Sequence, residues 1–578
     1  MGGAGGAGTA WRGGWTAATM SWQGSGAIAG RVADQVVQAL VNEGVERIFC
    51  VPGESFLGIT DALHEAPSIR LIVCRHEGGA GYMAVADGQL SRRPGVCMVS
   101  RGPGASNAMI ALHSALHDAM PLVVLIGQVR TDERGRQALQ EQDYTRWLTD
   151  VTKAVMPVDV PSQAAEMIGR AFHVAQSGTP GPVAVILPED VLEMPATATL
   201  AAPAPRAVAG PAAADLDRLA TTLREAERPI VLVGGAFERE RSGAALERLA
   251  ESWGLPVLST NRRPHLFDFG HQNFGGYVGL RTPAPLMEAL RTTDLLVALG
   301  ERMTDPLSQS YTFPAAPEPQ VPFVHVWPDP VEVGRVWRPT LGLPCDPGEV
   351  IAALSRLAAP RVTEARRAWV ARLHAVQADL MRPVWQPTED GVNFAAVACA
   401  VARHLSAEAV VTSDAGNFAT FIHRYIPFGS RQVFLSSVVG AMGAGVPMAV
   451  AAAIREPGRQ VVGFAGDGGL MMTGNEIATA RLHGAAPVII VSDNGGYGTI
   501  AMHQRGRYPG RRFQADTALH RLDLVQWAGA FGARGLRIER EDEVDSVIAE
   551  ALSPSPVPMV VQVASSMMQA TAWRRFEA

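Results

Sequence analysis

Short apolar runs alternate with stretches of helical periodicity along most of the chain. Residues 33–45 place Val36, Val37, Leu40 and Val41 on one face of a helix. Apolar runs typical of buried strands follow it in the segments RIFCVPG, IRLIVCRHE, GVCMVSRGPG, PLVVLIGQV and PVAVILP. Strands that alternate with helices in this way predict a parallel sheet covered by helices on both faces.

The same alternation returns twice. An Ala- and Pro-rich segment over 196–215 precedes a second block with the runs PIVLVGGA, LPVLST, DLLVALG and PFVHVWPD. A charged helical stretch over 363–381 leads to a third block with AVVTSDAGN, QVVGFA, PVIIVSDN and PMVVQVA. We therefore expect an α/β fold with three doubly wound parallel-sheet domains.

These boundaries divide the chain into six segments. They are a disordered extension over 1–25, a first domain over 26–195, a linker over 196–215, a central domain over 216–360, a helical linker over 361–390 and a third domain over 391–578. The Gly- and Ala-rich extension lacks the basic start and apolar core of a signal peptide.

Composition narrows the class of protein. A chain of 578 residues is too long for a single hydrophobic core. Its net charge of −6 argues against a nucleic-acid partner, and it has no apolar run long enough to span a membrane. The five cysteines are scattered and lack metal-ligand spacing, so we expect reduced thiols and a cytoplasmic protein.

Two polar side chains stand at the ends of neighbouring strand-like runs in the third block. QVVGFA leads into Gly466-Asp467-Gly468-Gly469, and PVIIVSDN ends at Asn494. Thr473 and Glu476 fit a capping box, which predicts a helix beginning there and ending before Gly484. This βαβ unit brings Asp467 and Asn494 to the edge of the sheet where ligands bind.

The chemistry of this pair suits a metal-bound diphosphate. A carboxylate and a carboxamide are oxygen ligands for Mg²⁺, which usually bridges to phosphate. The backbone N–H groups of Gly468 and Gly469 are available to phosphate oxygens. Neither a Walker loop nor a dinucleotide fingerprint is present in this segment. The alternative is a glycine-rich turn whose Asp467 only caps a helix.

At this point the residues resemble a known signature. GDG followed by Asn494 is similar to the thiamine-diphosphate-binding motif. RHEGGAGYMAVADG, RGPGASNA, Gly127-Gln128-Val129 and GAMGAGVPMAVAAA resemble further landmarks of the acetolactate synthase-like group, in the same order over 27–563. The resemblance implies an N-terminal pyrimidine-binding domain, a central domain and a C-terminal diphosphate- and Mg-binding domain.

The resemblance also implies residue roles. Glu77 would hydrogen-bond the aminopyrimidine, Met442 would support the bent cofactor, and the Gly440 carbonyl would accept from its amino group. Gln128 would point at the reacting centre. Asp467, Asn494 and Gly496 would ligate Mg²⁺. The full set of implied cofactor-binding residues is Glu77, Asn417, Phe418, Gly440, Met442, Gly466, Asp467, Gly468, Gly469, Asn494, Gly496, Tyr497 and Gly498.

Candidate substrate residues lie on other segments. His113 and His117 share one helical face and could transfer protons, or could be solvated histidines. His76 precedes Glu77 and is expected to cap or pack. His503, in YGTIAMHQRGRYPG, belongs to a segment that could cover the substrate, with basic residues facing a carboxylate.

The implied activity is a C–C bond reaction beside a carbonyl. We expect thiamine-diphosphate- and Mg-dependent decarboxylation of a 2-oxo acid, with carboligation of the resulting carbanion to a second carbonyl. The alternatives are a simple 2-oxo acid decarboxylase, an acyloin or 2-hydroxyacyl lyase, and an inactive cofactor-binding homologue. A homodimer or homotetramer with active sites between subunits is implied. The central block departs from the family's flavin contacts, which argues against bound FAD.

Overall fold

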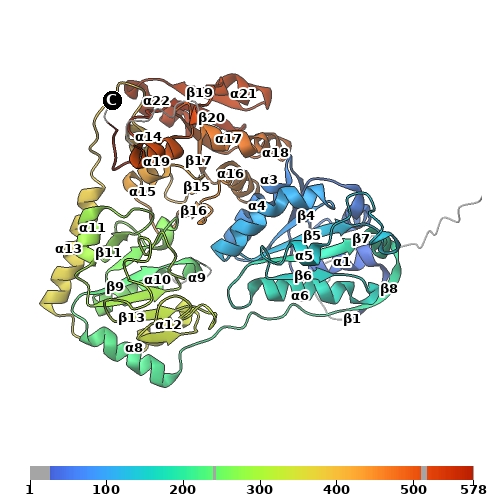
Figure 1. The fold of residues 1–578 in the computed structure, drawn as a ribbon, viewed down its shortest axis with the longest axis horizontal. Helices are drawn as coiled ribbons and strands as arrows, with labels where there is room; N and C mark the ends of the chain where they lie inside the picture. Colours follow the sequence, from blue (N-terminus) through green and yellow to red (C-terminus); the bar gives the residue numbers. More distant parts are fainter. Residues whose placement is uncertain (1–25, 239–242, 509–516, 577–578) are drawn as a thin grey trace, which may run out of the picture.

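The computed structural model describes residues 26–238, 243–508 and 517–576. Three six-stranded sheets form its framework, and every pair of neighbouring strands in them is parallel. Each sheet belongs to a separate α/β unit, and the three units form a triangle in projection (Figure 1). The fold class expected from the sequence is confirmed. The expected extension over 1–25 lies outside the described residues.

The first sheet has the strand order β3-β2-β4-β5-β7-β6. Its strands are β2 (Arg47–Cys50), β3 (Arg70–Val73), β4 (Gly95–Val99), β5 (Leu122–Gln128), β6 (Ala154–Pro157) and β7 (Pro182–Pro188). Its helices are α1 (Val32–Asn42), α2 (Leu57–Ala62), α3 (Glu77–Ser91), α4 (Pro103–Asp118), α5 (Tyr144–Trp147), α6 (Ala164–Gln176) and α7 (Glu189–Glu193). β4, β5 and β7 are buried along their whole length, because helices cover both faces of the sheet.

The central sheet has the order β11-β10-β9-β12-β13-β14. Its strands are β9 (Pro229–Val233), β10 (Val257–Ser259), β11 (Phe274–Tyr277), β12 (Leu295–Leu299), β13 (Phe323–Val326) and β14 (Leu341–Leu343). The helices of this unit are α8 (Ala213–Glu225), α9 (Gly235–Glu238), α10 (Gly243–Trp253), α11 (Ala284–Leu290), α12 (Pro347–Ser355) and α13 (Glu364–Leu380). α13 confirms the helix predicted over 363–381.

The third sheet has the order β16-β15-β17-β18-β20-β19. Its strands are β15 (Val410–Ser413), β16 (Val433–Leu435), β17 (Val461–Gly466), β18 (Val488–Asp493), β19 (Arg534–Ile538) and β20 (Met559–Ala564). The helices are α14 (Phe394–His404), α15 (Ala419–Tyr425), α16 (Gly445–Arg455), α17 (Asp467–Thr473), α18 (Ile477–Leu482), α19 (Gly498–Arg507), α21 (Leu524–Ala530) and α22 (Val544–Ala551). α16 packs on α3 and so joins the third unit to the first.

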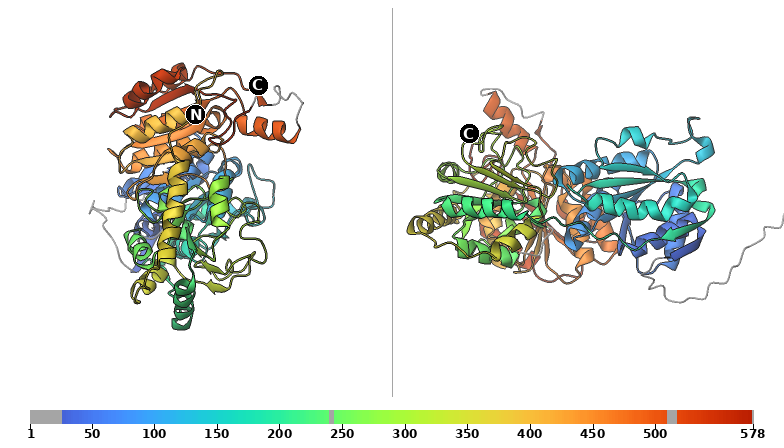
Figure 2. Two further views of the ribbon diagram at one scale, coloured as in Figure 1. Left: turned by 90° about the vertical axis from the view of Figure 1, so that its left-hand side faces the viewer. Right: turned by 90° about the horizontal axis from the view of Figure 1, so that it is seen from below.

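The segment expected to be a linker over 196–215 contains regular structure at both ends. β8 (Pro195–Leu200) pairs antiparallel with β1 (Gly26–Arg31) along its whole length. α8 begins at Ala213. The true connection is therefore shorter than predicted, and it crosses the lower edge of the molecule from β8 to α8 (Figures 1 and 2).

The predicted capping box at Thr473 and Glu476 is wrong. α17 begins at Asp467, directly after β17, and ends at Thr473. A 3₁₀ turn over Gly474–Glu476 then leads into α18, which ends at Leu482, so the predicted helical segment is present, but no side chain caps it. The Thr473 hydroxyl donates to the Gly443 carbonyl at 2.6 Å. Glu476 is fully buried, and its carboxylate accepts the backbone N–H groups of Arg75 (3.1 Å) and His76 (2.9 Å). It stabilises a contact between units rather than a local helix start.

A second buried carboxylate, from the first unit, accepts hydrogen bonds from the backbone of the third unit. Asp118, at the end of α4, accepts the backbone N–H groups of Val438 and Val439, each at 2.9 Å. Buried carboxylates are stabilised by such charge-assisted hydrogen bonds. Glu476 and Asp118 therefore fix the first and third units against each other.

Glu476→Gln should lower stability, because the new amide donor would face two backbone donors. Leaving these buried groups poorly paired costs about 1–3 kcal/mol in free energy of unfolding. A lower urea midpoint in equilibrium unfolding checks this. Glu389→Gln, at an exposed position, is the matched control and should leave the midpoint unchanged. Equal midpoints for both variants would contradict the role given to Glu476.

Candidate functional site

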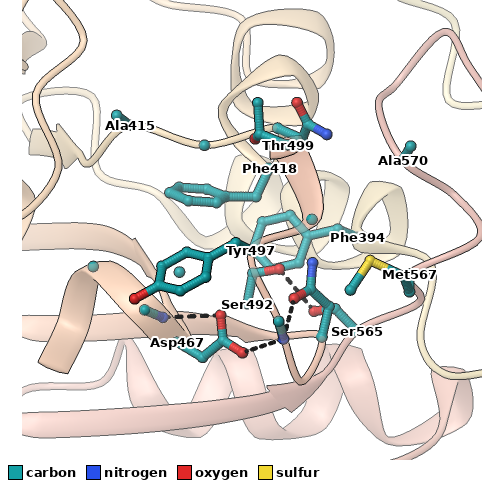
Figure 3. Close-up of a pocket in the computed structure, with 18 of the residues that line it drawn as sticks. Phe394, Ala415, Phe418, Asp467, Ser492, Tyr497, Thr499, Ser565, Met567 and Ala570 are labelled. Atoms are coloured by element: carbon teal, nitrogen blue, oxygen red, sulfur yellow. Dashed lines mark hydrogen bonds between the residues drawn. The ribbon is translucent and has the colours of Figure 1, made fainter. Parts of the chain in front are cut away.

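The register of β17 and β18 brings the two polar strand ends together. Gly466 pairs with Ser492, so the residues that follow lie side by side at the carboxyl edge of the sheet. One carboxylate oxygen of Asp467 accepts the backbone N–H of Gly496 at 3.0 Å, and Asn494 Oδ1 accepts the same N–H at 3.2 Å. Figure 3 shows Asp467 held by two such bonds, the second from Gly468. The three residues expected to ligate a metal, although they follow two different strands, thus meet at the Gly496 N–H.

Asp467 lies in an environment that disfavours its negative charge. Burial, together with the nearby Asp493, raises the pKa of Asp467 to about 6, against the pull of the backbone N–H groups of Gly468 and Gly496. A bound cation reverses this balance, because its charge stabilises the carboxylate directly. The position is therefore suited to a metal ligand.

A cavity of about 220 Å³ opens beside this turn. All twelve cofactor-binding residues that the sequence predicts in the third unit line it: Asn417, Phe418, Gly440, Met442, Gly466, Asp467, Gly468, Gly469, Asn494, Gly496, Tyr497 and Gly498. Among its described lining residues Asp467 is the only charged one. Phe418, Tyr497 and Phe394 give the cavity an aromatic wall (Figure 3).

Two backbone features leave room for a ligand in the cavity. Gly440 has φ +78°, and no atom lies within 4 Å of the place where a Cβ would stand. α19 begins at the cavity, so the positive end of its dipole faces the space inside. Met442 is only partly buried and lines the cavity, so it is not an ordinary core methionine. These features fit a diphosphate with an apolar ring system attached.

Asp414 organises the cavity wall, a role that sequence reasoning missed. It follows β15 and is 1% exposed. One carboxylate oxygen accepts backbone N–H groups of Ala415 and Gly443, each at 2.8 Å. Burial raises the pKa of Asp414 to about 6. The residue ties the turn after β15 to the Met442 loop, and the only signal for it in the sequence is its place at a strand end.

A further part of the lining also escaped prediction. It comes from α14 and from the segment after β20, with Phe394, Ser565, Ser566, Met567, Gln569 and Ala570. Ser492 donates to Ser565 at 3.0 Å, as Figure 3 shows. The carboxyl end of β20, next to β18, is the signal that points to these residues.

Glu77 is placed apart from this cavity. It begins α3, and the His76 side chain accepts from the Gly78 N–H, which confirms the expected cap. Glu77 is partly buried, and Asn107 donates to its carboxylate at 2.9 Å. The cavity lining contains no residue of the first unit within the described ranges.

The other expected residues of the first unit also lie outside the cavity. Gln128 is buried, and its amide is engaged with backbone: it donates to the Gln142 carbonyl at 2.7 Å and accepts from the Val129 N–H at 2.9 Å. His113 is exposed and packs on His117, with ring centroids 4.4 Å apart. Their shared face is as predicted, but the structure brings neither histidine to the Asp467 turn.

The chain contains matches to three domain descriptions of one enzyme family, in order. They are the N-terminal TPP binding domain of thiamine pyrophosphate enzymes over 30–147, the central domain over 216–354 and the C-terminal TPP binding domain over 414–563. Asp467, Asn494 and the other ten predicted lining residues of the third unit fall within the match over 414–563.

Relatives of similar length support the same grouping. The chain is 31% identical to the acetolactate synthase of Mycobacterium bovis over 541 residues, covering 92% of this chain and 87% of the relative. It is 30% identical to the acetolactate synthase isozyme 1 large subunit of Escherichia coli, covering 92% and 93%. It is 28% identical to a probable acetolactate synthase large subunit of Methanocaldococcus jannaschii, covering 90% and 89%. The chain therefore belongs to the thiamine pyrophosphate enzyme family, in its acetolactate synthase-like group.

Proposed function

We propose that this enzyme uses thiamine diphosphate and Mg²⁺ to decarboxylate a 2-oxo acid and to join the remaining fragment to a second carbonyl. The observation that carries the proposal is the meeting of Asp467 and Asn494 at the Gly496 N–H, inside a cavity of otherwise uncharged residues. The relatives named acetolactate synthase support the reaction class.

The need for a metal follows from charge. A diphosphate is strongly anionic, yet the described lining of the cavity offers it no Lys or Arg and one aspartate. Asp467 and Asn494, with the Gly496 carbonyl, are the oxygen ligands that would hold Mg²⁺ between protein and phosphate. No cluster of three His, Cys, Asp or Glu is found among the described residues, so a carboxylate–carboxamide–carbonyl set suits this site better than a zinc-type set.

The catalytic role falls to Glu77. Thiamine diphosphate supplies a carbon centre that adds to a carbonyl and accepts the electrons of the broken C–C bond. Glu77 would share a proton with the aminopyrimidine and so hold it in the basic form that acts on that carbon. Asn107 keeps the carboxylate oriented. Met442 and Gly440 would contact the cofactor between its two rings.

A second copy of the chain completes the site. Glu77 lies outside the cavity of its own chain, so the partner's Glu77 is the one that would reach the cofactor. Met471 and Met472 follow Asp467 on α17 and are 44% and 46% exposed. Apolar side chains exposed beside a cofactor cavity mark an interaction surface. We therefore assign a homodimer, or a tetramer built from two.

The central sheet argues against FAD as a second cofactor. Ligands of such sheets bind where strand order reverses, here between β9 and β12. That crevice is filled by side chains: a Cβ on Gly234 would lie 2.2 Å from Glu301 Oε2, and one on Gly235 would lie 2.8 Å from Arg263 Nη2. Arg263 also pairs with Glu238 at 3.0 Å. Glu238 is part of the same filled crevice. Burial raises the pKa of Glu238, but His265 and Arg263 lower it to about 2, so the ion pair with Arg263 is stable.

The described part of the chain has no helix long and apolar enough to cross a membrane. The five cysteines are free and buried. We propose a reducing compartment, the cytoplasm, as the setting that suits these thiols.

Product analysis tests the reaction. With pyruvate or benzoylformate, carboligation of two 2-oxo acids releases one CO₂ for each two consumed, whereas simple decarboxylation releases one CO₂ and one aldehyde for each. We expect one CO₂ for each two 2-oxo acid molecules consumed, at equal rates with and without added FAD. One CO₂ and one aldehyde for each 2-oxo acid molecule would support a decarboxylase instead. Consumption of aldehydes or acyl-CoA substrates, but of no 2-oxo acid, would overturn the proposal.

Asp467→Asn should weaken cofactor binding. Loss of the one anionic metal ligand should lower thiamine diphosphate affinity in the presence of Mg²⁺ by about 100-fold or more. Isothermal titration calorimetry with thiamine diphosphate and Mg²⁺ measures this. Asp217→Asn, at an exposed position on α8, is the control. Unchanged affinity in Asp467→Asn would remove the metal assignment.

Glu77→Gln should separate turnover from binding. An amide cannot exchange a proton with the cofactor, so kcat should fall by about 10²–10⁴-fold while thiamine diphosphate affinity changes little. Steady-state kinetics and calorimetry on the same preparation give the two values. Glu65→Gln, exposed after α2, should behave as wild type. Full activity in Glu77→Gln would refute its assigned role.

A further inference from the structure

A second cavity, of about 650 Å³, lies between the central and third units. It shares five lining residues with the cofactor cavity: Ala415, Gly416, Asn417, Gly440 and Thr499. Most of the remaining walls come from the loop after β10, the segment after β11, the end of α13, α15, α19 and the chain after β20. A molecule in this cavity is therefore in contact with the space around the cofactor.

The charged residues that line this second cavity in the described chain are all cationic. Four arginines line it, Arg262, Arg281, Arg424 and Arg574, whereas its described lining has no Asp or Glu. The partners of these guanidinium groups in the described chain are neutral: a hydroxyl, a thioether, an imidazole, backbone carbonyls and aromatic rings. Clustered cations without acids attract an anion.

Arg262 is the most constrained of the four. Its backbone has φ +58°, which is uncommon for a residue with a long side chain, and the Tyr277 hydroxyl accepts its N–H at 3.0 Å. Its guanidinium donates to Ser436 Oγ at 2.6 Å, four residues before Gly440. Burial lowers the pKa of Arg262, against the opposing charges of the nearby Asp414 and Asp118. An anion in the cavity would give the guanidinium a charged hydrogen-bond partner in addition to Ser436.

Arg281 is a second cation in the lining, and His503 lies beside it. Arg281 also has a left-handed backbone, with φ +59°, and its guanidinium lies 3.4 Å from the ring nitrogens of His503. Partial burial, and then the charge of Arg281, lower the pKa of His503. Arg424 is less available, since it stacks over Trp573 and donates to the Leu380 carbonyl.

The departing carboxylate of a 2-oxo acid is a poor occupant of this cluster. Arginines that bind it strongly would stabilise the substrate more than the transition state in which that charge is lost. An anionic group that stays on the substrate carries no such penalty. The cavity is also larger than the space around the cofactor, which suits a substituent extending away from the reacting carbon.

We propose that this arginine cavity binds a second anionic group on the donor substrate, so that the enzyme prefers 2-oxo acids with a distal carboxylate, sulfonate or phosphonate. The inference rests on the proposed decarboxylation and narrows its substrate class. Arg262 and Arg281 provide the bidentate and charge-assisted hydrogen bonds that such groups accept.

Matched donor pairs test the inference. CO₂ release is followed for 2-oxopentanoate against 2-oxoglutarate, and for 2-oxobutanoate against sulfopyruvate and phosphonopyruvate. The wild-type enzyme should favour the charged member by about tenfold or more in kcat/KM, as expected for one charged hydrogen-bonding contact. The best of the three anions identifies the distal group.

Variants assign the preference to the cavity. Arg281→Gln and Arg262→Gln should each lower kcat/KM for the charged donor by about 10–100-fold, mainly through KM, with a much smaller change for the neutral donor. Arg291→Gln, exposed and outside the cavity, is the control. Unchanged thiamine diphosphate affinity shows that each variant is folded.

Two results would overturn the inference. If neutral donors are used as well as charged ones, or if the variants lose both to the same extent, the cavity does not select a second charge, although the decarboxylation itself stands. If no 2-oxo acid of either kind releases CO₂ from enzyme that binds its cofactor, the proposed function fails and the inference fails with it.

Discussion

The parallel pairing of β17 with β18 is the constraint on which the site depends. It fixes Asp467 and Asn494 at one edge of the third sheet, where the Gly496 N–H joins them. Because the described lining of the cavity is otherwise uncharged, a cation bound at this turn, as proposed, would in turn hold a diphosphate. Asp414 then ties the Met442 loop to the same edge. The anchor thus follows from strand register rather than from any single side chain.

Two buried carboxylates fix the position of the first unit relative to the third. Glu476 holds the backbone that leads into Glu77, and Asp118 holds the backbone that leads into Gly440. Each unit therefore positions a segment of the other. The lining of the cofactor cavity contains no residue of the first unit in the described chain, so on the proposed function Glu77 would act in the site of a second copy. The second cavity lies elsewhere, and its arginines come from the central and third units.

The sequence predicts those parts of the fold that are buried on both sides. The inner strands of each sheet are continuous apolar runs, and all of them were predicted. The missed strands of these three sheets, β6, β11, β14, β16 and β19, lie at sheet edges, where burial is partial and the apolar pattern is short. The separate pair of β1 and β8 was also missed. The Asp467 turn could be predicted, because its residues are close in sequence. Contacts between distant segments could not: Glu476 fits a local capping box in the sequence yet binds Arg75 and His76. The arginine cavity is lined by several segments that are distant in sequence, so no local sequence pattern predicts it.

Subunit complementation tests the central claim, that each active site combines the Asp467 turn of one subunit with Glu77 of the other. Glu77→Gln and Asp467→Ala chains are inactive alone, and are then mixed under conditions that exchange subunits. Each mixed dimer would contain one site with both native residues, so random pairing should restore about a quarter of the wild-type activity, as two-fold symmetry requires. If both residues of a site came from one chain, every site in the mixture would carry a substitution. Mixed dimers that form yet stay inactive would therefore contradict the account.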